Sequence, residues 1–134
     1  MSSWTHALWV GAGGFLGAVL RWGVGMTGGW ISRLVGASPA LGLPFATLTV
    51  NVVGCFVFGL LAGFSDARGT LTEEARLFLF VGLLGGFTTY SALGFETFAM
   101  LKSADWLRAA LHIGLHLVLG IGAIGVGYAL GNAR

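Results

Sequence analysis

Long apolar stretches, separated by short segments that hold most of the charged residues, dominate this chain. They predict helices over residues 6–26, 44–65, 75–100 and 107–130. Each stretch is long enough to cross the hydrocarbon core of a membrane, for which an α-helix needs about 20 residues. The alternation over about 10 residues that is typical of membrane strands is missing. The pattern therefore predicts an all-α integral membrane protein with four transmembrane helices per subunit.

Composition and motifs narrow the class of protein further. Hydrophobic residues make up 56% of the 134 residues and charged residues only 9%, against about 25% charged residues in a soluble domain. We therefore expect one membrane domain over residues 1–134. The basic residues are scattered, which argues against a nucleic-acid-binding face. No nucleotide-binding, hydrolase or zinc-protease motif occurs, so we do not expect an enzyme.

The segments between the stretches carry signals for helix ends. Pro44 suits the first turn of the second helix. Residues 70–73, Thr-Leu-Thr-Glu, fit a capping box before the third helix. Asp105 is a candidate N-cap for the fourth helix. We assign residues 27–43 to a connecting loop, with room for a short helix in the membrane interface.

The distribution of basic residues bears on topology. Four spans place both termini on one side of the membrane. The basic residues on that side are Arg68, Arg76 and Arg134, and those on the other are Arg33, Lys102 and Arg108, with Arg21 if its side chain reaches the interface. An orientation is set by an imbalance of such residues. The near balance predicts dual topology with antiparallel pairing; the alternative is one orientation chosen by a small bias.

Pairs of glycines four residues apart recur in the predicted spans. Such pairs let membrane helices approach closely. A subunit of four helices is too thin to enclose a polar pathway alone, so we expect these pairs to favour a tight oligomer. The pairs are Gly13 and Gly17, Gly59 and Gly63, Gly82 and Gly86, and Gly127 and Gly131.

Polar residues within the spans are candidates for function, because polar groups are costly in lipid. Asn51 lies one turn from Thr47, and its amide fits either an anion site or a hydrogen bond between helices. Glu96 is the one carboxylate inside a predicted span and fits a pathway group, a proton site or an interfacial residue. Arg21 fits an interfacial anchor or an electropositive vestibule for anions.

Small and polar residues interrupt the third stretch. Residues 82–91 read Gly-Leu-Leu-Gly-Gly-Phe-Thr-Thr-Tyr-Ser. The glycines, threonines and serine in this run have low propensity for a continuous helix. We expect the helix to break near residues 85–89, in mid-membrane. In other membrane proteins with broken helices, the backbone groups freed at the break bind ions. The alternative is an intact helix with a glycine-rich packing face.

Two histidines share one face of the fourth helix. His112 and His116 are four residues apart. Such a pair can bind zinc, but a structural site needs four ligands and no acidic or Cys partner lies beside it in sequence. The other interpretation is a polar track or a hydrogen bond between helices, to which histidine would add sensitivity to pH.

Three blocks of the sequence resemble the signature segments of the Fluc (CrcB) fluoride channels. They are residues 17–22 (Gly-Ala-Val-Leu-Arg-Trp), residues 47–56 (Thr-Leu-Thr-Val-Asn-Val-Val-Gly-Cys-Phe) and the run 82–91. The resemblance implies a fluoride-selective channel that passively exports cytoplasmic fluoride across the inner (plasma) membrane. It implies an antiparallel dual-topology homodimer, with a structural Na⁺ at its centre held by main-chain carbonyls of Gly85 and Thr88.

The resemblance also assigns pore residues. Asn51 matches a pore-lining Asn, and Tyr90 matches the first position of an aromatic box whose ring edges face fluoride. Glu96 matches an acidic residue after that box, and Arg21 an Arg of the first helix. Donors without fixed charge suit a small, strongly hydrated anion. The other pore candidates are Thr89, Ser91, Leu93, His112 and His116.

Two departures from the family pattern keep other functions open. Leu93 stands where the family usually has a second Phe, and leucine has no electropositive ring edge. His112 and His116 stand where Tyr and Ser are usual. One alternative is therefore a non-conducting subunit of a heterodimeric channel. A separate alternative is a small dual-topology multidrug or cation exporter, because such proteins share the length, dual topology and glycine content expected of this chain. Those exporters need a Glu in the first helix, however, where this chain has Arg21.

Overall fold

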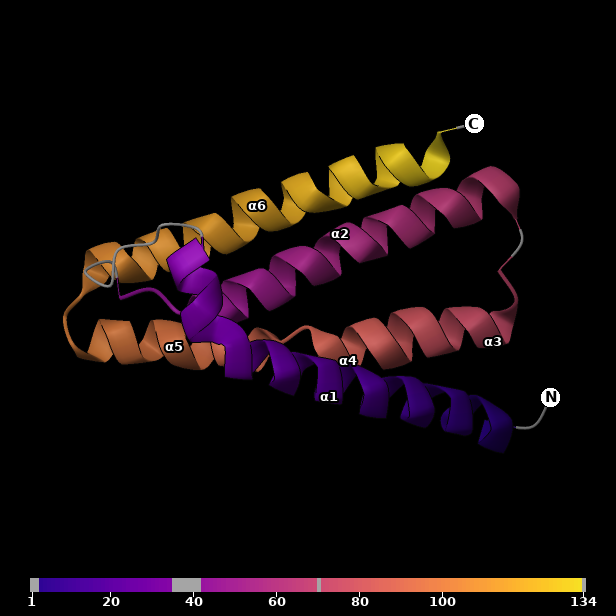
Figure 1. Ribbon diagram of the computed structural model, residues 1–134, viewed down its shortest axis with the longest axis horizontal. Helices are drawn as coiled ribbons and strands as arrows, with labels where there is room; N and C mark the ends of the chain where they lie inside the picture. Colours follow the sequence, from indigo (N-terminus) through magenta and orange to yellow (C-terminus); the bar gives the residue numbers. More distant parts are fainter. Residues whose placement is uncertain (1–2, 35–41, 70, 134) are drawn as a thin grey trace.

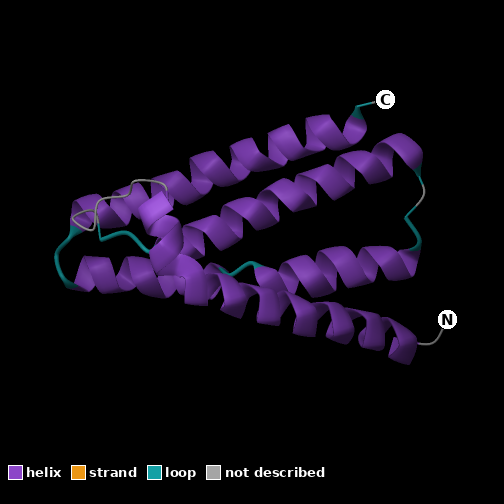
Figure 2. Ribbon diagram, viewed as in Figure 1, coloured by secondary structure: helices purple, strands orange, loops and turns teal. Residues whose placement is uncertain are grey.

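The computed structural model describes residues 3–34, 42–69 and 71–133. These residues form helices joined by short loops, and Figure 2 shows no strand among them. The all-α prediction is confirmed. The elements are α1 (Ser3–Leu34), α2 (Phe45–Arg68), α3 (Glu73–Arg76), the π-helix η2 (Leu77–Leu84), α4 (Gly85–Phe87), α5 (Tyr90–Lys102) and α6 (Trp106–Asn132).

Four helical segments are long and apolar enough to cross a membrane. They are Ser3–Met26, Phe45–Arg68, Glu73–Lys102 and Trp106–Asn132. The third combines α3, η2, α4 and α5. The number of spans predicted from the sequence is therefore confirmed for the described residues.

The helix ends follow the predicted signals in part. Asp105 accepts a hydrogen bond from the backbone of Arg108 at the start of α6, as expected of an N-cap. The cap of α3 is Thr72, which accepts from the backbone of Ala75; Thr70, with which the expected capping box begins, lies outside the described residues. The connecting loop predicted from residue 27 is wrong in its first part. Residues 27–34 continue α1 instead, and Figure 1 shows this end of the helix turning away from its earlier course.

The helices form two packed pairs. The helices within a pair run in the same direction, and the two pairs run in opposite directions. Figure 1 shows α1 beside the α3–η2–α4 segment and α2 beside α6. Both α1 and α3 begin at the end of the molecule where the termini lie, whereas α2 and α6 end there. Contacts of α1 with α2 and of α5 with α6 join the two pairs.

The glycine pairs pack helices within this subunit. A Cβ at Gly13 or Gly17 of α1 would overlap backbone atoms of η2 and α4, and one at Gly86 would overlap the backbone of Gly14. The same holds between α2 and α6, where Gly59 and Gly127 each face the partner backbone directly. The expectation that these pairs favour an oligomer is therefore corrected, because contacts inside the chain already use them.

Buried and exposed residues are distributed as in a membrane protein. The buried apolar residues among those described are Val50, Leu84 and Ala109, whereas the buried polar residues are Thr47, Ser65, Thr97, His112 and His116. Large apolar side chains are exposed along all the spans. An apolar exterior suits lipid, and the polar interior indicates where function should be sought.

Candidate functional site

The polypeptide leaves the helical conformation between α4 and α5. Thr88 has φ −77° and ψ 160°, and Thr89 has φ −148° and ψ 112°. Both residues are extended, and they lie in the range 85–89 named from the sequence. Extended residues inside a helical segment leave backbone groups that must find other partners.

Asn51 of α2 supplies partners for one of these residues. Its Nδ2 donates to the carbonyl of Thr89 at 3.1 Å, and its Oδ1 accepts from the backbone nitrogen of Thr89 at 2.8 Å. The amide therefore satisfies both polar groups of a single peptide residue. The second N–H of the same amide makes no hydrogen bond within the described part of the chain. Asn51 thus makes a hydrogen-bonded link between helices, one of the two roles that the sequence left open. The other role, an anion site, stays a prediction.

Two carbonyls near the extended residues lose their usual helical donors. The amide four residues after Gly85 is that of Thr89, which bonds to Asn51 instead. The amide four residues after Thr88 is that of Ala92, which bonds to the side chain of Thr89 at 3.2 Å. The carbonyls of Gly85 and Thr88 are therefore released from the α-helical pattern, which fits a cation held by main-chain oxygens.

Arg21 of α1 contacts one of these carbonyls. Its Nη1 donates to the carbonyl oxygen of Thr88 at 3.3 Å. This contact differs from both roles predicted from the sequence, interfacial anchor and vestibule, because it directs the guanidinium at the extended segment. It also places a positive charge beside an oxygen that the family resemblance assigns to Na⁺.

A second set of polar side chains connects α2, α5 and α6. Thr47 donates to Glu96 Oε1 at 2.6 Å, and Glu96 Oε2 lies 3.2 Å from His112 Nε2. The rings of His112 and His116 meet edge to face, with centroids 4.5 Å apart. His116 Nδ1 lies 2.8 Å from the carbonyl oxygen of His112. We call Thr47, Glu96, His112 and His116 the polar cluster.

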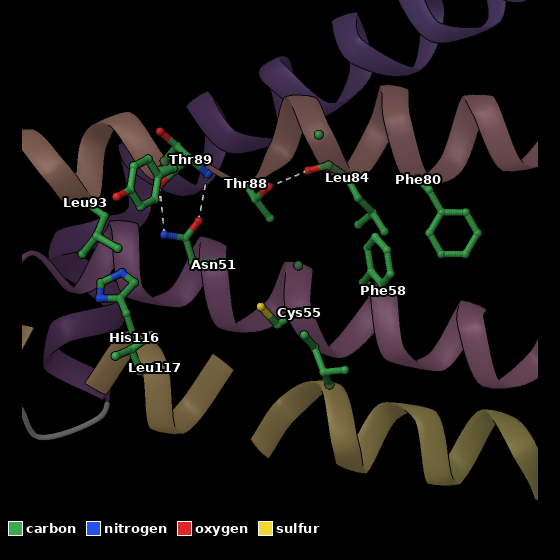
Figure 3. Close-up of a pocket in the computed structure, with 14 residues that line it drawn as sticks. Asn51, Cys55, Phe58, Phe80, Leu84, Thr88, Thr89, Leu93, His116 and Leu117 are labelled. Carbon is green, nitrogen blue, oxygen red and sulfur yellow. Dashed lines mark hydrogen bonds between the residues drawn. The ribbon is translucent and has the colours of Figure 1, made fainter. Parts of the chain in front are cut away.

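Open pockets flank the polar cluster. The first, of about 470 Å³, is lined by His116 together with Asn51, Thr88, Thr89, Tyr90 and Leu93 (Figure 3). The second, of about 380 Å³, is lined by Glu96 together with Ser103, Asp105 and Arg108. His112 is only 2% exposed and contacts both Glu96 and His116, one residue from the lining of each pocket. The polar cluster therefore connects one pocket to the other through the interior of the subunit.

The predicted site residues do not all gather in one place. Asn51, Thr89, Leu93 and His116 line the first pocket together. Tyr90 also borders it but is 87% exposed. Gly85 and Thr88 border the first pocket as well. The other predicted residues lie outside it: Ser91 is exposed beside the Thr89 hydroxyl, and Glu96 and His112 belong to the polar cluster.

Thr47 is a site residue that the sequence analysis does not assign, and its hydroxyl donates to the one carboxylate of the cluster. Its position one turn before Asn51 was the available signal. No group of three His, Cys, Asp or Glu side chains within the described ranges is arranged to hold a metal ion. The histidine pair thus lacks the further ligands that a structural zinc site requires.

Comparison with known proteins finds relatives along nearly the whole chain. Residues 8–128 match the family model described as CrcB-like protein, Camphor Resistance (CrcB). A Thermus thermophilus protein named fluoride-specific ion channel FluC is 44% identical over 126 residues, covering 94% of this chain and 93% of that protein. Proteins of the same name from Chloroflexus aurantiacus and Hyphomonas neptunium are 39% and 43% identical and cover 95% and 90% of this chain and of their own lengths.

Proposed function

Because this chain belongs to the CrcB family, we propose that it forms a fluoride-selective channel that exports cytoplasmic fluoride passively. The observation that carries the proposal is the 44% identity to a protein named fluoride-specific ion channel over 94% of the chain. With four helices able to span a membrane, the chain is a multi-pass membrane protein. We place it in the inner (plasma) membrane, where a negative interior drives an anion outward.

The chemistry of the first pocket supports an anion as the permeating ion. Its polar residues are the amide of Asn51, the hydroxyls of Thr88, Thr89 and Tyr90, and the ring of His116. A pore for a dehydrated anion must replace water with hydrogen-bond donors, and the Asn51 amide and the Thr89 and Tyr90 hydroxyls can donate without a fixed charge. Ser91 extends the set through its contact with the Thr89 hydroxyl. The carboxylate of Glu96 is held in the polar cluster, away from this pocket.

We further propose that two copies assemble antiparallel, with the break at Thr88 and Thr89 at membrane depth. Two observations support this arrangement. The near balance of basic residues gives no strong orientation. The first pocket is open at the surface, and the Tyr90 ring beside it is 87% exposed. A second copy would cover this ring and close the pathway. In the homodimer, each subunit would contribute Asn51, Tyr90 and Leu93 to such a pathway.

The Gly85 and Thr88 carbonyls are candidates for a structural Na⁺ between the two copies. Their release from helical hydrogen bonding fits this role, because hard cations take oxygen ligands. A bound Na⁺ would supply a positive charge at the centre of the dimer and fix the break in both subunits. The guanidinium of Arg21, which donates to the Thr88 carbonyl, would have to yield that oxygen or share it.

Fluoride efflux from liposomes tests the proposed function. Purified protein is reconstituted in liposomes loaded with potassium fluoride, valinomycin is added to carry the compensating K⁺, and a fluoride electrode records release. Matched liposomes loaded with potassium chloride measure selectivity. Rapid fluoride release with little chloride release is expected. Fluoride release no faster than from protein-free liposomes would refute the channel and favour a non-conducting subunit.

Labelling of a single cysteine tests dual topology. Cys55 is half-buried, so Cys55→Ala provides a background for Ser103→Cys in the exposed turn after α5. Both changes leave the charge balance intact. A membrane-impermeant maleimide applied to intact cells should label about half of the protein. Complete labelling, or none until the cells are lysed, would show a single orientation and refute the antiparallel pair.

A further inference from the structure

The hydrogen bond of His116 fixes the position of its proton. His116 Nδ1 lies 2.8 Å from the carbonyl oxygen of His112. A carbonyl oxygen only accepts hydrogen bonds, so the proton of the neutral ring is on Nδ1. The other ring nitrogen, Nε2, then carries a bare lone pair. This Nε2 is buried and has no hydrogen-bond partner in the described part of the chain.

The neutral ring is therefore unsuited to an anion. His116 is 8% exposed and lines the first pocket, and Figure 3 shows its ring reaching from α6 into the space between α2 and α5. A bare lone pair on Nε2 repels any fluoride that reaches it. After protonation, Nε2 becomes an N–H donor with a positive charge, which binds an anion more strongly than a neutral donor does.

The charged and titratable groups near His116 come from α2, α5 and α6. On α5, the carboxylate of Glu96 lies 3.2 Å from His112 Nε2, and Tyr90 borders the pocket. From α2, the titratable residue at the pocket is Cys55. On α6 itself, Arg108 is paired with Asp105 at 3.1 Å. Glu96 is thus the charged residue that contacts the histidine pair in the described part of the chain.

We propose that His116 binds fluoride together with a proton, which makes the pocket beside Asn51 a proton-linked fluoride site. The inference rests on the proposed fluoride channel and adds a chemical condition to it. One proton from water and one fluoride add no net charge to a buried site, so the cost of burying either ion alone is avoided. By linkage, acid strengthens fluoride binding and fluoride strengthens proton binding by the same factor.

The first test is fluoride efflux from the same liposomes at a series of equal internal and external pH values. The range of about pH 5 to 8 covers the ordinary titration of histidine. Wild-type efflux should fall as pH rises, by up to about tenfold per pH unit while one proton is linked to conduction. Protein-free liposomes at every pH measure the leak of HF through lipid, which is subtracted.

Three variants locate the titrating group. His116→Gln replaces the ring by an amide that donates at every pH, so its efflux should be independent of pH. His6→Gln is the matched control, because His6 lies on α1 near Glu73, away from the polar cluster, and it should keep the wild-type slope. His112→Gln tests the neighbouring ring; loss of the slope in this variant with its retention in His116→Gln would overturn the assignment.

Proton uptake provides a second measurement that needs no conduction. Sodium fluoride is added to purified protein in weakly buffered detergent solution, and a pH electrode records the change after subtraction of a protein-free blank. Wild type and His6→Gln should take up protons with fluoride but not with chloride, and His116→Gln should take up none. Fluoride efflux that is flat with pH in the wild type overturns this inference and leaves the channel intact. Absence of fluoride efflux at every pH overturns both.

Discussion

Substitution of Gly17 by alanine tests whether backbone contact between α1 and the third span holds this fold. A Cβ at Gly17 would overlap the carbonyl oxygen of Leu83 and would lie 2.7 Å from the backbone nitrogen of Phe87. Ordinary contact begins at 3.4 Å, so the nitrogen alone requires a shift of about 0.7 Å. Both obstructing atoms belong to helical backbone and cannot rotate away as a side chain can. The two helices must therefore separate.

The magnitude follows from two opposing terms. Overpacking of a close interface costs about 1–3 kcal/mol. Alanine is favoured over glycine within a helix by about 1 kcal/mol. Because the obstructing atoms are backbone, we expect the upper part of the range, and a net loss of about 1–2 kcal/mol for Gly17→Ala. Gly11→Ala is the control, since nothing lies within 4 Å of a Cβ at Gly11 on the same helix.

The assay is thermal unfolding of the two variants and the wild type in the same detergent. Gly17→Ala should unfold at a lower temperature than the wild type, whereas Gly11→Ala should match it or exceed it. Gly17→Ala should also conduct less, because α1 carries Arg21 to the carbonyl of Thr88. Equal melting temperatures for the two variants would show that the interface adapts without cost, and the argument from backbone contact would be refuted.

Three further predictions test the other contacts of the site and fold. Asn51→Leu leaves both backbone groups of Thr89 without their partner, at about 1–3 kcal/mol for each group, and should lower both the melting temperature and fluoride efflux; unchanged efflux would exclude Asn51 from the pathway. Arg21→Gln removes a cation from beside a proposed Na⁺ ligand, the Thr88 carbonyl. The NaCl concentration that gives half of the maximal rise in melting temperature should therefore be lower than for the wild type, with choline chloride keeping the total salt constant. An unchanged concentration would contradict this prediction. Gly127→Ala should destabilise the α2–α6 pair, whereas Gly125→Ala, with nothing within 4 Å of its Cβ, should not; equal melting temperatures would count against that packing.

The spans and their ends were largely predictable because they depend on local chemistry. Hydropathy located four membrane-spanning segments, and a side-chain oxygen at Asp105 marked the start of α6. The end of α1 was not predictable in the same way. Glycines and a tryptophan suggested a loop from residue 27, but the helix continues to Leu34. The π-helix Leu77–Leu84 also escaped prediction, because its apolar sequence is equally suitable for an α-helix.

The glycine pairs show why a motif does not name its partner. Gly-x-x-x-Gly spacing predicts close approach between two helices, and such approach does occur at Gly17 and Gly127. Nothing in the spacing distinguishes a helix of the same chain from a helix of another copy. The structure pairs α1 with the third span and α2 with α6. Pairing of two subunits is therefore expected to use other surfaces, and the exposed side chains of Tyr90 and Leu117 offer one beside the pocket.

The extended segment at Thr88 and Thr89 illustrates the part of a site that local sequence cannot fix. Its composition predicts that a helix is unfavourable there, but not which conformation replaces it. Asn51 of α2 binds both backbone groups of Thr89, and Arg21 of α1 binds the carbonyl of Thr88. Partners from two distant elements thus stabilise the extended conformation. Loss of either should change the site more than substitution of a hydroxyl within it, because the backbone itself would then lose its hydrogen bonds.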